Sequence, residues 1–227
     1  MEARVPSNAV GSRDLARRLG IDESRVRRLA ARGRLPGRKV GHDWLFNVSL
    51  IDDEFARERH RGRPYSQRNA LGLLFLASGL EPAWLEPNIR TRLTRRVVVP
   101  LVTLRPRLKS RAERRLYLVP DALRRRLAAD PAFVLSGVSA CERYKVDIVV
   151  RNVTEGYTDR SMIDRAQYRH ALERVGEPEA NLIVHVVPRL FLPTGRFMPH
   201  AVVGADLADS SDGRTKRAGH ELLSRER

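Results

Sequence analysis

The feature that most limits the fold is a pair of short amphipathic segments that meet at Gly20. Ser12 and Asp22 are suitable N-cap residues for two helices, and Gly20 can take the left-handed conformation that closes the first one. Each segment carries three apolar residues at helical spacing: Leu15, Ala16 and Leu19 in the first, and Val26, Leu29 and Ala30 in the second. Two short helices joined by a glycine-containing turn form a helix-turn-helix unit. The sequence therefore predicts this unit between Ser12 and Gly33.

The second predicted helix exposes a polar face that is rich in arginine. This face carries six residues: Glu23, Ser24, Arg25, Arg27, Arg28 and Arg32. In a helix-turn-helix unit the second helix enters the DNA major groove, so its N-terminal residues meet base edges and its later residues lie near phosphates. A solvated charged face is the alternative explanation of a basic helix. We favour DNA contact through Ser24 and the four arginines, because they lie on the helix that this motif presents to DNA.

A β-hairpin is predicted directly after the two helices. Pro36-Gly37 marks a turn, and a tight loop at residues 41–43 separates two short extended runs. A hairpin in this position is a wing. We expect phosphate contacts from Arg17 or Arg18 in the first helix, and from Arg38 and Lys39 in the wing. Trp44 and Phe46 are expected to pack beneath the helices rather than to stack on bases.

Residues 12–46 resemble the small winged helix-turn-helix of the MerR/excisionase type. The characteristic Gly-x-Leu-Pro turn of that family is present as residues 33–36, Gly-Arg-Leu-Pro. Its Val-Gly-x-x-Trp wing is present as residues 40–44, Val-Gly-His-Asp-Trp. The resemblance implies a DNA-binding winged helix and covers less than a quarter of the chain.

The overall charge agrees with a nucleic-acid partner. The 227 residues include 43 Lys and Arg against 27 Asp and Glu, which gives a formal net charge of +16 and a pI near 11.2. Such a charge indicates a polyanionic partner. The densest positive block lies between Arg90 and Arg126, where 13 basic residues accompany two acidic ones. This block is interpreted as a solvated face, a second phosphate-binding surface or a docking surface for an acidic protein.

Cysteine content and hydropathy exclude several other classes. Cys141 stands alone, so a disulfide within the chain and a cysteine-rich zinc site are excluded. The N-terminus lacks a signal-like apolar core, and no apolar run approaches the ~20 residues that span a bilayer. We therefore expect a cytoplasmic protein without a membrane segment.

Composition and periodicity divide the chain into three regions: a winged helix-turn-helix domain at 1–48, a helix and basic linker at 49–67, and an α+β regulatory domain at 68–227. Helices are predicted at 49–60, 67–79, 86–96, 121–130, 159–176 and 213–225. Short β-branched runs predict strands at 96–104, 114–120, 132–140, 146–153, 181–188 and 200–207. The helices and strands alternate too irregularly for a doubly wound sheet, so the predicted fold class is mixed α+β.

The chain lacks the common catalytic motifs: there is no phosphate-binding Gly-Lys loop, dinucleotide fingerprint or His-Glu-x-x-His run. Residues 136–140, Ser-Gly-Val-Ser-Ala, differ from a nucleophile elbow, and a turn and packing role is favoured. His185 lies within an apolar strand, where a hydrogen-bonded core histidine is favoured over a catalytic or ligand role. Asp206, Asp209 and Asp212 suit turns and helix caps better than a metal site. We predict no enzyme activity, no cofactor and no metal site.

The region from about residue 120 to 225 is similar to the C-terminal domain of AbiE-type (AbiEi family) antitoxins. The motifs that carry this similarity are Ser136-Gly137-Val138-Ser139-Ala140, the strand from Asn181 to Pro188, and Asp206-Leu207 through Arg214, Ala218 and Leu222-Leu223. The resemblance implies an autorepressing DNA-binding antitoxin that is encoded beside a nucleotidyltransferase-like toxin, with that toxin as its protein partner.

Together these patterns predict a two-domain regulator that binds double-stranded DNA. One small helix-turn-helix buries too little surface for tight binding, so we expect paired binding at an inverted repeat in the chain's own promoter. The alternative is a protein-interaction module whose second domain binds a partner, with DNA contact secondary. RNA binding is disfavoured by an aromatic content of 6% and the lack of an aromatic-rich sheet.

Overall fold

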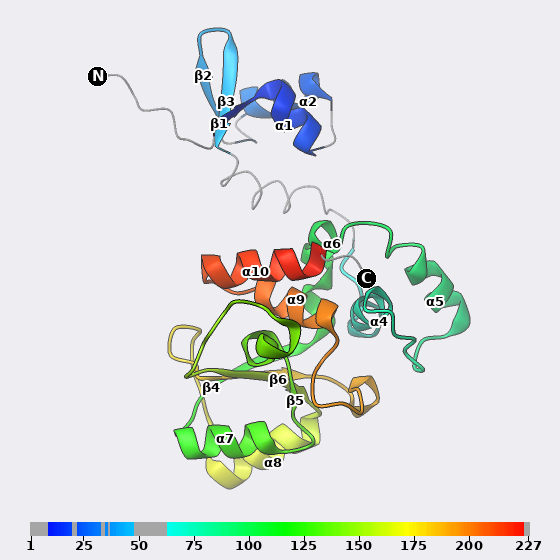
Figure 1. The fold of residues 1–227 in the computed structure, drawn as a ribbon, viewed down its shortest axis with the longest axis vertical. Coiled ribbons are helices and arrows are strands. Elements are labelled where there is room, and N and C mark those ends of the chain that lie inside the picture. The colour runs from blue at the N-terminus through cyan, green and yellow to red at the C-terminus, as the bar shows by residue number, and fades with distance from the viewer. Residues whose placement is uncertain (1–8, 20–21, 33–34, 36, 48–62, 225–227) are drawn as a thin grey trace. The chain divides into compact units, whose positions relative to one another are not determined.

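A computed structural model gives the fold of the chain (Figure 1). It describes residues 9–19, 22–32, 35, 37–47 and 63–224. The chain forms two compact units, residues 1–62 and 63–227. Both contain helices and strands, so the predicted α+β class is confirmed. The helix predicted at 49–60 lies outside the described residues.

The first unit is a three-stranded antiparallel sheet packed against two helices. Its elements are β1 (Ala9–Gly11), α1 (Ser12–Leu19), α2 (Glu23–Ala31), β2 (Gly37–Val40) and β3 (Asp43–Asn47), with β3 in the centre of the sheet. The core consists of Leu15, Ala16, Val26, Ala30, Leu35 and Phe46. Trp44 packs against this core, and its ring lies 6.2 Å from that of Phe46. The predicted packing of both aromatic residues is confirmed, and β1 is an addition to the predicted elements.

The second unit contains seven α-helices among its described residues. They are α4 (Gln67–Ala77), α5 (Pro87–Thr94), α6 (Leu101–Leu108), α7 (Asp121–Ala129), α8 (Arg160–His170), α9 (His200–Ala208) and α10 (Gly213–Ser224). The helices predicted at 67–79, 86–96, 121–130 and 213–225 are confirmed as α4, α5, α7 and α10. Ser66 caps α4 as its sequence indicates, because its hydroxyl accepts the amide N–H of Asn69. No helix in the described ranges has both the length and the apolar character needed to cross a bilayer.

A five-stranded mixed sheet lies between the helices of the second unit. Its strands are β4 (Glu113–Leu118), β5 (Val134–Leu135), β6 (Thr154–Thr158), β7 (Glu173–Arg174) and β8 (Leu182–Val186), in the order β5-β6-β8-β4-β7. β6 and β8 are parallel and are connected through α8, whereas the other pairs are antiparallel. The register places Tyr157 of β6 opposite His185 of β8.

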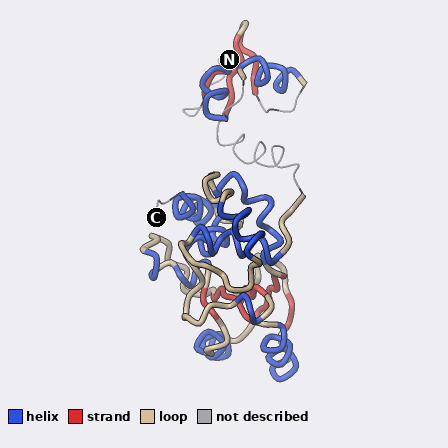
Figure 2. The backbone as a smooth tube through the Cα atoms, turned by 90° about the vertical axis from the view of Figure 1, so that its right-hand side faces the viewer, coloured by secondary structure: helices blue, strands red, loops and turns tan. Residues whose placement is uncertain are grey.

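The two faces of this sheet are covered by different helices, as the two views show (Figures 1 and 2). α7 and α8 cover one face, where Leu182, Val184 and Val186 of β8 join a core with Met162 and Ile163 of α8. Because side chains alternate along a strand, the intervening His185 points to the opposite face, on which α9 and α10 lie. That alternation separates an apolar face from one that carries polar groups.

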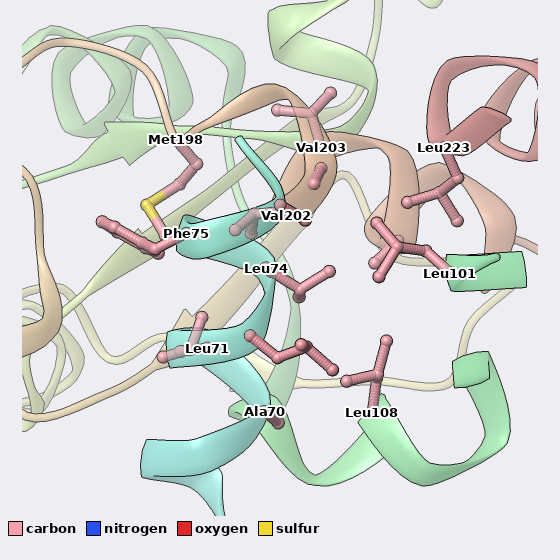
Figure 3. Packing of buried hydrophobic residues seen from close by; sticks show 14 of the residues in the cluster. Ala70, Leu71, Leu74, Phe75, Leu101, Leu108, Met198, Val202, Val203 and Leu223 are labelled. Carbon is pink, nitrogen blue, oxygen red and sulfur yellow. The ribbon is translucent and has the colours of Figure 1, made fainter. Parts of the chain in front are cut away.

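The larger core lies among α4, α6, α9 and α10 (Figure 3). Leu74 of α4 points toward Leu101 and Leu108 of α6, and Leu223 of α10 lies near Leu101. α10 packs closely on α9, because a Cβ at Gly219 would lie 2.2 Å from the backbone nitrogen of Ala208. The backbone of α9 is thus fixed tightly in place.

One predicted strand is a helix in the structure, and a second lies partly in a helix. Residues 200–207 form α9, whose eight residues from Ala201 to Ala208 are all buried. A short run of apolar, partly β-branched residues fits a buried strand and a buried helix equally well, which explains the error. In the run 96–104, Pro100 precedes α6 and supplies its N-cap position, so the apolar residues on either side of it belong to different structures.

Three other predicted boundaries are wrong for local reasons. The strand predicted at 146–153 is irregular, and β6 begins only at Thr154. The strand predicted at 132–140 is limited to β5, because Gly137 with φ +48° begins a 3₁₀ turn through Ala140. The helix predicted to reach residue 176 ends at His170, because Ala171 adopts the left-handed conformation with φ 47°. Leu172 and Val175 therefore lie beyond α8.

Candidate functional site

The orientation of α2 is fixed by its cap and its buried face. The Asp22 carboxylate accepts the amide N–H of Ser24 at 2.8 Å. Hydrogen bonds from Ser24 and the nearby charge of Arg28 lower the pKa of Asp22 below its ordinary value, so the cap is ionised at neutral pH. Val26 and Ala30 are buried against the first core. The opposite face of α2 must therefore point to solvent.

Three of the predicted DNA-binding arginines form one stripe on the exposed face. Arg25, Arg28 and Arg32 follow each other at i, i+3 and i+7, a spacing that keeps them on one side of a helix. All three are exposed. None of them forms an ion pair with a carboxylate of the described residues. Three guanidinium groups are thus available to an anionic ligand along about two turns.

The other predicted residues of the helices have protein partners or cannot be placed. Arg27 forms an ion pair with Glu23 at 2.7 Å, and Arg17 forms one with Asp14 at 3.5 Å. Exposed pairs of this kind contribute only ~0.2–1 kcal/mol, so DNA phosphates can compete for both arginines. Ser24 takes part in the α2 cap, which explains its presence without DNA. Arg18 lies in α1, and its side chain is outside the described part of the chain.

The wing exposes both of its predicted phosphate contacts. β2 is the edge strand of the sheet, and all four of its residues are exposed. Arg38 pairs with Leu45 and Lys39 with Trp44, so the two basic side chains project from opposite faces of the hairpin. Gly41, with φ 61°, permits the tight turn between the strands.

Comparison with known families identifies this unit. A family model described as "Helix-turn-helix domain" matches residues 11–59. The chain has an N-terminal helix-turn-helix domain. No curated protein and no solved structure matches the chain. The resemblance of residues 120–225 to AbiE-type antitoxins gains no support from these comparisons.

The basic block between Arg90 and Arg126 is not one continuous surface. Arg111, Arg115 and Arg124 are buried. Arg115 bridges Glu113 at 2.8 Å and Asp164 at 2.7 Å, and these hydrogen bonds raise its pKa further. Arg124 pairs with Asp121 and donates to the Thr154 hydroxyl at 3.1 Å, while Arg111 pairs with Asp206 and Asp209. Part of the block thus stabilises the second unit internally, and only the remainder can contact a partner.

Outside the helix-turn-helix domain, the second unit contains a buried polar cluster centred on Asp206 of α9. Arg111 donates to Oδ1 of Asp206 through Nε at 2.9 Å and Nη2 at 2.7 Å. The Tyr157 hydroxyl donates to the same oxygen at 2.9 Å, and the Ser136 hydroxyl donates to Oδ2. Burial acts to raise the pKa of Asp206, but the neighbouring His185 and Arg111, with the Ser136 hydrogen bond, lower it overall. Asp206 is therefore an ionised interior residue.

Glu155 of β6 and His185 of β8 continue the cluster. Nε2 of His185 lies 2.8 Å from Oε1 of Glu155 and 3.9 Å from Oδ1 of Asp206. The backbone N–H of Val138 donates to Oε2 of Glu155 at 3.2 Å. The His185 ring stacks on Tyr157, with centroids 4.6 Å apart. Burial together with the adjacent Asp206 charge raises the pKa of the Tyr157 hydroxyl, which stays protonated.

The sequence predictions for these residues have mixed outcomes. His185 is a buried, hydrogen-bonded histidine as expected. Asp212 caps α10, since its carboxylate accepts the Thr215 N–H at 2.7 Å. The cap role expected for Asp206 is wrong, because this residue lies within α9. Residues 136–140 do form a turn, but the turn also holds Glu155 and Asp206, a role that no local pattern indicates.

A cavity of about 460 Å³ opens beside the cluster. Glu155, His185 and Asp206 form part of its lining, and Asp209 lies next to them. Val138, Val153 and Ile183 contribute apolar wall, and Lys109, Arg114 and Glu177 contribute charged groups. A volume of this size can hold a small ligand.

Proposed function

We propose that this chain is a sequence-specific transcriptional regulator that represses its own promoter through its helix-turn-helix domain. The observation that carries the proposal is the exposed stripe formed by Arg25 and Arg28 of α2 and Arg32 at its C-cap, opposite the buried Val26 and Ala30. In such domains the second helix lies in the major groove. The formal charge of +16 supports a polyanionic partner.

The position of each arginine on α2 suggests its role. Arg25 is the third residue of the helix, near the end that meets base edges, and its guanidinium suits O6 and N7 of guanine. Arg28 and Arg32 follow toward the C-terminal end, where phosphate contact is expected. Lys39 on the wing supplies a further phosphate contact. The small size of one such domain favours two copies at an inverted repeat.

Two substitutions distinguish base recognition from phosphate contact. Arg25→Ala should weaken binding to the promoter site by ~1–3 kcal/mol and binding to random DNA much less. Lys39→Ala should weaken both similarly and make the slope of log affinity against log salt shallower by about one. Binding is measured by fluorescence anisotropy on labelled duplexes over a range of salt concentrations. The exposed Arg143 of the second unit, replaced with alanine, is the matched control.

The wild-type chain should show a salt slope near ~−5, as expected for five or six phosphate contacts. A flat salt response, or equal affinity for all duplexes, contradicts the sequence-specific function. If Arg25→Ala leaves the ratio of promoter to random binding unchanged, α2 is not the recognition helix. The protein-interaction alternative would then be favoured.

The more specific version of this function is an antitoxin. It rests on the similarity of residues 120–225 to AbiE-type antitoxins, and it makes a nucleotidyltransferase-like toxin the partner of the second unit. Co-expression with the product of the neighbouring gene provides the test, with cell growth as the readout. The Arg25→Ala variant should still neutralise the toxin, because α2 lies in the other unit. A neighbouring product that does not arrest growth, or an arrest that this chain does not relieve, contradicts the antitoxin role.

A further inference from the structure

The buried cluster of the second unit carries an excess of negative charge. The carboxylates of Glu155, Asp206 and Asp209 are accompanied by one guanidinium, that of Arg111. The carboxylates outnumber this guanidinium inside a chain whose overall charge is +16. Buried charges are retained only when they are paired or when they coordinate a metal. The cluster therefore calls for a positively charged ligand.

An unsatisfied acceptor beside the cluster points in the same direction. Oδ1 of Asp209 is buried and has no hydrogen-bond partner among the described residues, while Oδ2 accepts from Arg111 at 2.8 Å. Asp209 lines the cavity together with Glu155 and His185. An unsatisfied carboxylate oxygen of this kind is suited to a cation or to a water molecule bound to one.

The donor atoms are spaced as a metal ion requires. One atom each from Glu155, His185 and Asp206 lie within 4.8 Å of one another. The distances from Nε2 of His185 are 2.8 Å to Glu155 and 3.9 Å to Asp206. Bonds of about 2.0–2.1 Å in tetrahedral geometry place ligand atoms ~3.3 Å apart, so shifts of roughly half an ångström bring both distances from His185 to this value.

Arg111 is compatible with this arrangement. Its two hydrogen bonds hold the Asp206 carboxylate in place, and its third, to Asp209, links the two aspartates. Its single guanidinium pairs with the two aspartates and leaves Glu155 without an arginine partner. The cavity beside the donors leaves room for water or a small ligand at the remaining coordination positions.

We propose that the second unit binds one divalent metal ion through Glu155, His185 and Asp206. A mixed set of imidazole nitrogen and carboxylate oxygen suits Zn²⁺ or Mn²⁺ better than Mg²⁺, which prefers oxygen ligands alone. This site is separate from the DNA-binding face of α2. The proposal departs from the sequence analysis, which predicts no metal site.

The test uses the full-length chain, treated with a chelator and then titrated with Zn²⁺, Mn²⁺ and Mg²⁺ in a calorimeter. We expect one Zn²⁺ or Mn²⁺ ion to bind per chain and to raise the thermal midpoint of unfolding. Glu155→Gln and His185→Asn should each weaken the affinity at least ~10-fold. Glu177→Gln removes a carboxylate from the same cavity but outside the cluster, and should leave the affinity unchanged.

Two further measurements locate the site and separate it from DNA binding. Bound Mn²⁺ should broaden the methyl NMR signals of Val138 and Ile183, which line the cavity, before that of Leu127 in the core on the other sheet face. This measurement needs no substitution, so it decides the location even if a variant fails to fold. The Arg25→Ala chain should bind metal like the wild type. Absence of saturable binding by all three ions, or binding that leaves the Val138 and Ile183 signals unchanged, overturns the proposal.

Discussion

Replacing Gly137 with alanine tests how closely the 3₁₀ turn holds the buried cluster. Gly137 has φ +48°, a conformation that disfavours any other residue by roughly 1–2 kcal/mol. An added Cβ would lie 1.8 Å from Oε2 of Glu155, so the carboxylate must move. That movement breaks its contacts with His185 and with the N–H of Val138. Each buried group left unsatisfied adds ~1–3 kcal/mol. We expect the free energy of unfolding to fall by about 3–8 kcal/mol.

Gly79 provides the matched control. It also has a positive φ, +76°, but an added Cβ would meet no atom within 4 Å. Gly79→Ala should therefore lower the free energy of unfolding only by the cost of holding alanine in the left-handed conformation, about 1–2 kcal/mol. The difference between the two variants isolates the steric effect on Glu155.

The assay needs a probe that reports the second unit alone. The chain has two tryptophans, Trp44 in the first unit and Trp84 in the second. In a Trp44→Phe background, fluorescence during urea denaturation reports on Trp84, which packs between Phe75 and Phe191. If Gly137→Ala is no more than ~1 kcal/mol less stable than Gly79→Ala, the turn does not constrain Glu155 as described.

Two further predictions concern titratable groups of the second unit. Asp159 caps α8 by accepting the N–H of Met162 at 3.1 Å, so Asp159→Ala should lower stability by ~0.5–2 kcal/mol at pH 7. Burial acts to raise the pKa of Asp159, but hydrogen bonds from Ser161 and Met162 lower it overall. The stabilisation of the folded state by this cap is therefore present above about pH 4, and it is lost as the pH falls through the lowered pKa. Thermal melts at several pH values check this, and a stability difference that persists in strong acid speaks against it. Burial, with the Glu155 charge, raises the pKa of the Cys141 thiol to about 11, so iodoacetamide at about pH 8 should label the chain only after denaturation, as mass spectrometry would show. Rapid labelling of the native chain would refute this expectation.

The helix-turn-helix domain could be predicted because its determinants are local. Asp22, Val26 and Ala30 lie within nine residues, and the period of the apolar positions alone sets which face of α2 is exposed. The stripe of arginines on the opposite face follows directly from that period. Its three members were all predicted as DNA contacts, and their exposure agrees with that role.

The second unit could be predicted only in part, for two physical reasons. α9 is buried on all sides, so its apolar residues show no period that separates a helix from a strand. The buried cluster combines Arg111 of a 3₁₀ turn (Lys109–Arg111), Glu155 of β6 and Asp206 of α9, which meet only when the sheet has formed. No spacing along the chain could indicate their proximity. The aspartates near the C-terminus were thus assigned to caps, which is correct for Asp212 and wrong for Asp206.

The long sequence separations within the cluster also determine when it can form. Asp206 contacts Tyr157, Ser136 and Arg111 across 49, 70 and 95 positions of the chain. Each contact closes a long loop, and closure entropy makes such contacts unfavourable until neighbouring elements are already in place. The cluster should therefore be largely unformed in the folding transition state. Interactions of this kind leave the folding rate almost unchanged and slow unfolding instead, so the cluster acts chiefly on the lifetime of the native second unit.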